Sequence, residues 1–151
     1  MEPTILHIET ATDVCSVALT QGMEVLGVKE SADGNSHSKN LLPFINRLLL
    51  EYDVKTTDLQ CVAVSIGPGS YTGLRIGVST AKGIAYSLGI PVITVSTLES
   101  IAQGAKHQTG NDHCDIVPMI DARRMEVFAA RYDAAMNMVD DVASAIVEEK
   151  T

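Results

Sequence analysis

The sequence has few aromatic side chains and few positive charges. Phe, Tyr and Trp make up only 4% of its 151 residues and Trp is absent, so aliphatic side chains must build the core. Eleven Lys and Arg residues stand against nineteen Asp and Glu, which gives a formal net charge of −8. Because cations supply most of the affinity for nucleic acid, we do not expect strong RNA binding by this chain alone.

Cysteine pairs and long apolar runs are also lacking. Cys15, Cys61 and Cys114 are far apart and odd in number, which favours reduced thiols in a cytosolic protein over disulfides or a structural zinc site. The first residues show no signal-peptide pattern, and no apolar run approaches the roughly 20 residues of a membrane span. The sequence predicts a cytoplasmic protein that makes no membrane contact.

The first part of the chain predicts three strands and a helix. Residues 4–10, 14–21 and 22–31 are short β-prone segments, typical of an antiparallel meander. The pattern then changes to helical spacing, with Leu41, Ile45, Leu48 and Tyr52 on one face. The start of this helix is open: Ser36 or Ser38 is the expected cap, and Pro43 is expected near the first turn.

The rest of the chain alternates strands and helices before a second group of strands. The expected elements are a buried strand at 61–66, a helix at about 72–87, a strand at 91–96, a short helix at 97–105, and strands at 116–122 and 125–133. Residues 107–115 are expected to form a polar loop, and residues 138–147 match neither pattern clearly.

This order predicts an α/β fold with a mixed sheet flanked by helices. We expect an N-terminal lobe over residues 1–110 and the beginning of an incomplete second lobe over residues 111–151.

The stretch "GPGSYTG", residues 67–73, follows a buried strand and precedes a helix, which is the layout of a phosphate-binding loop. It misses the Walker pattern, because Thr72 and Leu74 stand five positions after Gly67 and Gly69. It also misses the GxGxxG fingerprint, because Thr72 holds the place of the third glycine. No lysine lies inside the loop, so a phosphate site is not favoured here.

A second interpretation concerns the glycines of the helix itself. Gly73, Gly77, Ala81 and Ala85 are spaced by four, so they share one helix face that carries almost no side chain. Gly inside a helix costs about 1 kcal/mol relative to Ala, and close packing is the natural compensation. The sequence leaves two partners open for this face: the protein's own sheet, or another subunit.

Other candidate residues favour ordinary structural roles. His107, Asp112, His113 and Cys114 are of metal-ligand type, but their irregular spacing in a polar loop matches no known site. No Ser–His–Asp set or nucleophile elbow can be assembled. We predict no catalytic residue, no bound cofactor and no metal site.

Four strings resemble one protein family over nearly the whole chain. They are "ILHIETATDVCSVAL", "HSKNLLPFI", "SIGPGSYTGLRIGVSTAKGIAYSLGIPVITVSTLES" and "MIDARRMEVF". Together they resemble the bacterial TsaB (YeaZ) family, and GPGSYTGLRIG followed by AKG is the most specific part. The resemblance implies the actin, Hsp70 and sugar-kinase fold, which is ribonuclease H-like. Members of this family are appreciably longer than this chain.

The family is implied to act in making threonylcarbamoyladenosine in tRNA, next to the anticodon. The resemblance implies a TsaD-like catalytic partner and a TsaE-like ATPase, with tRNA contacted only through the complex. The catalytic relative carries a metal-binding HxxxH motif, where this chain has Thr97 and Ile101. Neither side chain can replace an imidazole ligand. The resemblance therefore implies a non-catalytic subunit. The family has also been labelled a glycoprotease, but the sequence shows no set of protease residues.

The family fold's phosphate turns also depart from their usual composition. Glu9 stands in place of an Asp and Ala11 in place of a Gly in the first turn. In "DARRM", Ala122 and Arg123 replace glycines of the catalytic relative, and Met125 stands where TsaB proteins often have Gly. A degraded nucleotide pocket is expected, and the rival hypothesis is a nucleotide-binding enzyme of the sugar-kinase type.

The predicted site is a helical interface with the TsaD-like subunit. When that subunit is absent, the same interface is expected to pair two copies of this chain. Its expected members come from both helices: Leu41, Ile45, Leu48, Gly73, Gly77, Ala81 and Ala85. A bulky residue at Gly77 is expected to block the association.

Overall fold

A computed structural model describes residues 2–33, 37–110 and 113–147. The chain forms two compact units. The first consists of Met1–Ile66 and Ser70–Val95, and the second of Gly67–Gly69 and Ser96–Thr151.

The first unit is built on a five-stranded mixed sheet in the order β3-β2-β1-β4-β5. β1 pairs with β2, and β2 with β3, in antiparallel fashion, whereas β4 runs parallel to both β1 and β5. The predicted meander is therefore confirmed, and a parallel α/β half follows it. The strands are β1 (Thr4–Glu9), β2 (Cys15–Gln21), β3 (Glu24–Ser31), β4 (Cys61–Ser65) and β5 (Val92–Val95).

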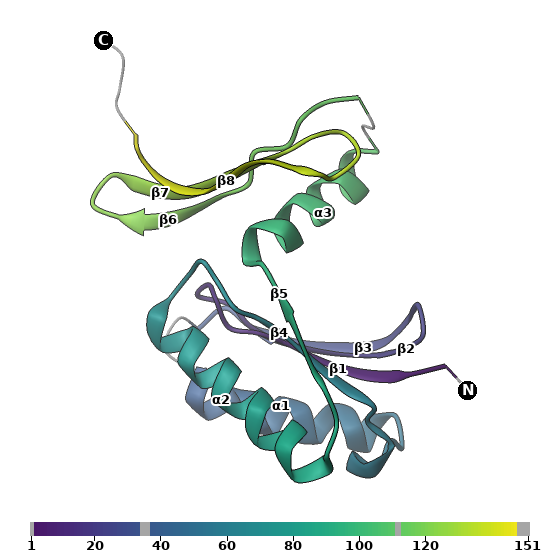
Figure 1. Cartoon of the computed structure of the whole chain (residues 1–151). Helices are drawn as coiled ribbons and strands as arrows, with labels where there is room; N and C mark the ends of the chain where they lie inside the picture. The colour runs from purple at the N-terminus through teal and green to yellow at the C-terminus, as the bar shows by residue number, and fades with distance from the viewer. Residues whose placement is uncertain (1, 34–36, 111–112, 148–151) are drawn as a thin grey trace. The chain divides into compact units, whose positions relative to one another are not determined.

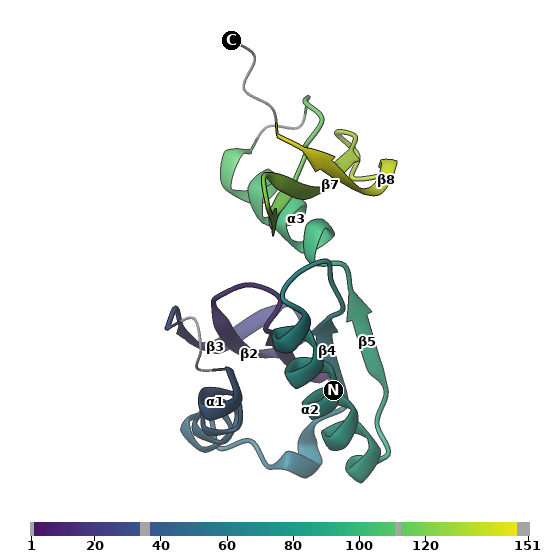
Figure 2. The same ribbon diagram turned by 90° about the vertical axis from the view of Figure 1, so that its left-hand side faces the viewer.

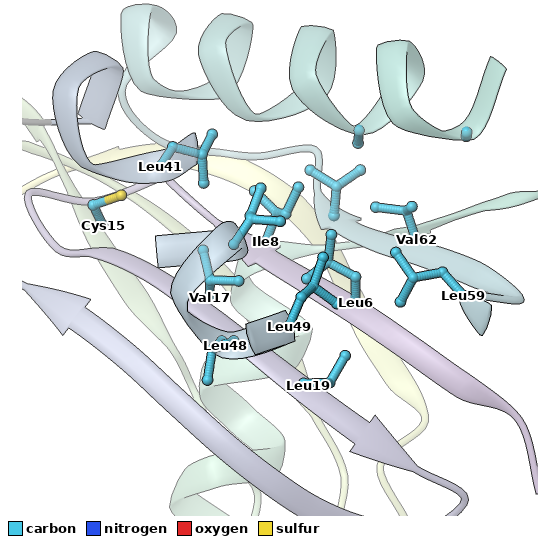
Figure 3. Close-up of a cluster of buried hydrophobic side chains, with 14 residues drawn as sticks. Leu6, Ile8, Cys15, Val17, Leu19, Leu41, Leu48, Leu49, Leu59 and Val62 are labelled. Carbon is cyan, nitrogen blue, oxygen red and sulfur yellow. The ribbon is translucent and has the colours of Figure 1, made fainter. Parts of the chain in front are cut away.

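Two helices, α1 (His37–Glu51) and α2 (Tyr71–Leu88), cover one face of this sheet (Figures 1 and 2). Side chains alternate along β1, so that every second residue points toward the helices. The register places Leu6 opposite Leu19 and Ile8 opposite Val17 on that same face. Figure 3 shows these strand residues meeting the leucines of α1 in a continuous aliphatic core.

The ends of α2 follow from capping chemistry. Ser70 accepts a hydrogen bond from the amide of Gly73 at 3.3 Å, which satisfies a free donor in the first turn. Gly89 ends the helix at φ 67°, a left-handed conformation that glycine adopts without strain. The expected helix at about 72–87 is therefore confirmed to within one residue at each end.

The expected start of the first helix is corrected at Pro43. The helix begins at His37, so Pro43 lies well inside it rather than in the first turn. Its side chain is exposed, and its ring nitrogen cannot donate to the carbonyl of Lys39. Ser38 is the second residue of the helix and not its cap, and Ser36 lies outside the described residues.

The second unit packs one helix, α3 (Thr97–Thr109), against a three-stranded antiparallel sheet in the order β6-β7-β8. Its small core comprises Leu98, Ala102, Ala130 and Tyr132. The helix runs four residues beyond the predicted 97–105, because Gly110 rather than a residue near 105 supplies the C-terminal cap. The strands are β6 (Met119–Arg123), β7 (Glu126–Tyr132) and β8 (Met138–Ile146).

The α/β fold class is confirmed: helices pack on a mixed sheet with the strand order β3-β2-β1-β4-β5. A single turn of 3-10 helix at Thr56–Asp58 precedes β4. Among the helices that the structure describes, none combines the length and apolar character needed to cross a membrane.

Candidate functional site

The small-residue face of α2 packs against the protein's own sheet. Gly73, Gly77, Ala81 and Ala85 are all buried, and the two alanines belong to the core of the first unit. Of the two partners that the sequence left open for this face, the structure places the protein's own sheet there.

Close approach to the end of β1 requires glycine at two of these positions. A Cβ added at Gly73 would overlap the carbonyl oxygen of Thr10, and one added at Gly77 would overlap the Thr10 hydroxyl. That hydroxyl donates a hydrogen bond of 2.8 Å to the carbonyl of Gly73. The glycines therefore let the helix backbone bond directly with the residue that follows β1.

The three leucine and isoleucine residues predicted for the interface are also interior. Leu41, Ile45 and Leu48 have exposed fractions of 1%, 4% and 0% and belong to the same core. Side chains buried this deeply are not available to another chain. The predicted interface core stays a prediction, and the burial of all seven residues inside the first unit does not favour it.

The opposite face of α2 is open. Tyr71, Arg75, Ser79, Lys82, Gly83 and Tyr86 lie along this side, and all are exposed; we call them the outer stripe of α2. The two tyrosines at its ends are 75% and 93% exposed. Tyrosine is one of the side chains enriched in binding hot spots.

Gly83 adds an independent observation on this stripe. Nothing lies within 4 Å of the position that its Cβ would occupy, so packing within the chain does not account for a glycine there. A helix-interior glycine costs about 1 kcal/mol relative to alanine. At Gly73 and Gly77, close packing offsets the loss of helix stability relative to alanine. At Gly83, no contact within the described residues offsets it.

A hollow of about 390 Å³ lies beside the outer stripe. The Arg75 guanidinium lies 5.5 Å from the centre of the Tyr71 ring, in the range of a cation–π contact. The hollow is bordered by hydroxyls, one cation and an aliphatic side chain. Its lining residues are Thr72, Arg75, Ile76, Ser79 and Thr80.

The end of β1, where the family fold has its first phosphate turn, is internally bonded. Glu9 accepts a hydrogen bond from the amide of Ala11 at 2.6 Å, and its other carboxylate oxygen accepts one from the Ser65 hydroxyl. Gly67 and Gly69 have φ of 114° and 158°, so the loop after β4 needs glycine for its backbone shape. Both oxygens of Glu9 are thus engaged by the chain itself.

The metal-type residues of the sequence are not gathered into a site. No group of three or more His, Cys, Asp or Glu in ligand geometry occurs among the described residues. His107 lies near the end of α3, Cys114 is exposed, and Asp112 is outside the described residues. Thr97 and Ile101 lie in the first turns of α3, with Thr97 buried and Ile101 partly exposed.

Two titratable groups of the first unit are shifted toward their neutral forms. Burial lowers the pKa of His7, whose Nε2 lies 2.9 Å from the Thr20 hydroxyl. Burial likewise raises the pKa of the Cys15 thiol, which disfavours the nucleophilic thiolate. These groups behave as structural residues.

Sequence reasoning overlooked the outer stripe of α2. The helical spacing that identified the small face also places Tyr71, Arg75 and Tyr86 on the other side of the same helix. The signal was available: two tyrosines among only six aromatic residues, four Tyr and two Phe, lie on one helix face.

Comparison with known proteins relates the chain to tRNA-modification proteins. A family model described as TsaD, tRNA N6-adenosine threonylcarbamoyltransferase, matches residues 18–149. A Bacillus subtilis protein named tRNA threonylcarbamoyladenosine biosynthesis protein TsaB is 37% identical over 92% of this chain and 59% of its own length. The Escherichia coli protein of the same name is 39% identical over 88% of this chain and 56% of its own length.

A solved structure agrees with these relatives. YeaZ from Pseudomonas aeruginosa superposes with a TM-score of 0.88 and 32% sequence identity, over 99% of this chain and 70% of that one. The chain spans somewhat more than half the length of the curated relatives it matches. On these grounds the chain belongs to the TsaB (YeaZ) family.

Proposed function

We propose that this chain is a non-catalytic subunit in the synthesis of threonylcarbamoyladenosine in tRNA. It binds a TsaD-like catalytic subunit through the outer stripe of α2 and the neighbouring exposed side of α1. The observation that carries this proposal is the pair of exposed tyrosines on α2, in a chain whose relatives are named for this biosynthesis.

The chemistry of the outer stripe suits a protein partner. Tyr71 and Tyr86 offer large apolar faces with a polar tip, and Arg75 and Lys82 add positive charge between them. Gly83 lets a partner backbone or side chain come close to the helix. We include in the proposed surface Leu42 and Leu50 of α1, which are 55% and 82% exposed.

The non-catalytic assignment draws support from the end of β1. Each carboxylate oxygen of Glu9 accepts one hydrogen bond from the chain itself, and these bonds compete with the positioning of a metal-bound phosphate. The rival function, a nucleotide-binding enzyme of the sugar-kinase type, requires measurable ATP affinity. Calorimetry of the isolated chain with ATP tests it, and low-micromolar binding would refute the non-catalytic proposal.

Other partners follow from the same role. A TsaE-like ATPase works on the assembled complex, and tRNA is reached through that complex in the cytoplasm. When the TsaD-like subunit is absent, the outer stripe pairs two copies of the chain in a symmetric dimer. We also retain the division into lobes at residues 1–110 and 111–151 as a proposal.

Association with the TsaD-like subunit tests the interface. Tyr86→Ala and Gly83→Leu are expected to weaken binding at least about 30-fold, the effect of losing one hot spot. Both positions are exposed, and the site of an added Gly83 side chain is open, so the isolated chain should keep its fold. Co-purification and titration calorimetry measure the loss, and circular dichroism confirms the fold.

Met23 provides the matched control. It is 99% exposed and lies in the turn between β2 and β3, away from α2. Met23→Ala should bind the TsaD-like subunit as the unaltered chain does. Full affinity of both Tyr86→Ala and Gly83→Leu would show that the partner uses another surface.

A further inference from the structure

The turn between β6 and β7 holds two adjacent arginines in an unusual backbone conformation. Arg123 pairs with Glu126 in the ladder, so Arg124 and Met125 form a two-residue hairpin loop. Arg123, Arg124 and Met125 have φ of 68°, 55° and 61°. A two-residue loop with positive φ at both positions favours Asn–Gly, because these residues adopt that conformation with little strain.

Strain in non-glycine residues is concentrated at functional sites, where the side chain is needed for its chemistry. The surrounding bonds hold this backbone in place. The Arg123 amide donates to the Asp121 carboxylate at 2.7 Å, and the Met125 carbonyl accepts from the amide of Val147 at 2.8 Å. Arginine at positions 123 and 124 therefore lowers the stability of the turn, and Asn or Gly at these positions would avoid that loss.

The guanidinium groups of this turn lack an ion-pair partner within the part of the chain that the structure describes. Both arginines are exposed, and no carboxylate in the described parts of the chain forms an ion pair with either, although Glu126 lies opposite Arg123. On the same sheet, in contrast, Arg131 is held by Asp140 at 2.7 Å and Asp115 at 3.0 Å.

These properties match a phosphate-rich ligand. The planar guanidinium binds phosphate oxygens with two parallel hydrogen bonds. Two side chains on a hairpin tip can reach successive phosphates of a nucleic acid backbone, and the exposed Met125 beside them can contact a sugar. The net charge of −8 limits this contribution to a local contact within a larger surface.

We propose that Arg123 and Arg124 contact the phosphate backbone of the RNA bound by the assembled complex. The contact positions the RNA and carries no sequence information. The choice of RNA as the ligand rests on the proposed role in tRNA modification. The contact itself rests on the turn's positive φ values and on its two exposed arginines, which form no ion pair within the described residues.

Salt-dependent RNA binding tests this contact. The probe is a labelled tRNA transcript, titrated by fluorescence anisotropy against the complex with the TsaD-like subunit at several KCl concentrations. The double variant Arg123→Ala, Arg124→Ala should bind about 10- to 60-fold more weakly at 0.1 M salt. It should also lower the slope of log affinity against log salt by about 2, one unit for each phosphate lost.

Three further variants separate charge from folding. Replacing both arginines by lysine should retain most of the slope, because lysine still neutralises a phosphate. Arg124→Gly suits the positive φ and should keep the turn folded while losing about one unit of slope. Lys55→Ala, which removes an exposed cation from the first unit, should leave affinity and slope unchanged.

Partner binding is measured on the same variants, so the two proposals fail separately. A normal complex with unchanged RNA affinity and slope in the double variant would overturn the arginine contact alone. If no complex forms, the proposed function fails, and crosslinking of the isolated chain to the transcript at low salt still tests the turn. Equal crosslinking of the unaltered chain and the double arginine variant would overturn the arginine contact. Displacement of the RNA by inorganic triphosphate at matched phosphate concentration would also overturn it.

Discussion

At the scale of single residues, the glycines of α2 and its C-terminal cap fall into three groups. Gly73 and Gly77 allow Thr10 to pack closely against the helix, and Gly89 supplies the left-handed cap. Gly83 meets nothing in the described structure. The sequence treats these residues alike, because spacing alone does not say what a helix face will meet.

Alanine substitution separates these groups. Gly73→Ala and Gly77→Ala should lower the free energy of unfolding by about 1–3 kcal/mol, since the overlap at Thr10 outweighs the gain in helix propensity. Gly73→Ala should be the more harmful, because its Cβ meets backbone rather than a side-chain hydroxyl. Urea denaturation of the isolated chain measures both.

Gly83→Ala is the internal control for this series. Its Cβ enters open space on a helix, so it should raise the free energy of unfolding by up to about 1 kcal/mol. Stabilisation by Gly77→Ala of the same size would mean that α2 does not approach Thr10 as closely as described.

Gly77→Leu cannot serve as the interface test that the sequence suggested. The new side chain would collide with Thr10 and Ile8 inside the first unit. A loss of association would then report damage to the core. Gly83→Leu and Tyr86→Ala act on the exposed side of the same helix and avoid this ambiguity.

At the scale of the element, α1 is stabilised by its buried face despite a proline inside it. Leu41, Ile45 and Leu48 anchor the helix to the sheet, and Lys29 of β3 pairs with Glu51 at 2.6 Å near its end. This exposed pair contributes little by comparison with the aliphatic packing. The sequence pattern predicted the buried face because a period of 3.6 places these residues together.

Replacing the proline should stabilise the helix. Pro43→Ala restores an amide donor to the helix interior and should raise the free energy of unfolding by about 1–2 kcal/mol, after the entropy gained by the unfolded chain is subtracted. Chemical denaturation measures the difference. Asn46→Ala, an exposed site on the same helix, controls for propensity alone and should change stability by only a few tenths of a kcal/mol. An equal effect at both positions would mean that the proline causes no strain.

At the scale of the whole molecule, burial differs strongly between the two units. All five residues of β4 are buried, whereas all nine residues of β8 are exposed. The second unit has a core cluster of four fully buried residues, compared with fourteen in the first. Apolar burial is the main favourable term in folding, so local stability should follow this difference.

Hydrogen exchange tests that gradient. Amides of β4, which is flanked by β1 and β5, should exchange most slowly, and those of β8 fastest among the strands. Mass spectrometry of peptic peptides resolves the two segments. Protection of β8 equal to that of β4 in the isolated chain would show that the second sheet is stabilised by something other than its visible core.

The sequence by itself determined the fold class, the order of strands and helices as far as β7, and membership of the TsaB family, whereas β8 (Met138–Ile146) was left open. These follow from local periodicity, capping residues and matching strings, which do not depend on distant contacts. The sequence also predicted that the helices over residues 37–51 and 71–88 form an interface, which stays a prediction. It did not determine which face of the second helix is available to a partner.

Tertiary structure alone decided that question. The small face of α2 turned inward because the turn after β1 brings Thr10 against it, 63 residues before Gly73 in the chain. The outer stripe was left exposed by the same packing. Likewise, only the hairpin register placed Arg124 and Met125 at positive φ. Contacts between residues far apart in sequence set both outcomes, and no local pattern encodes such contacts.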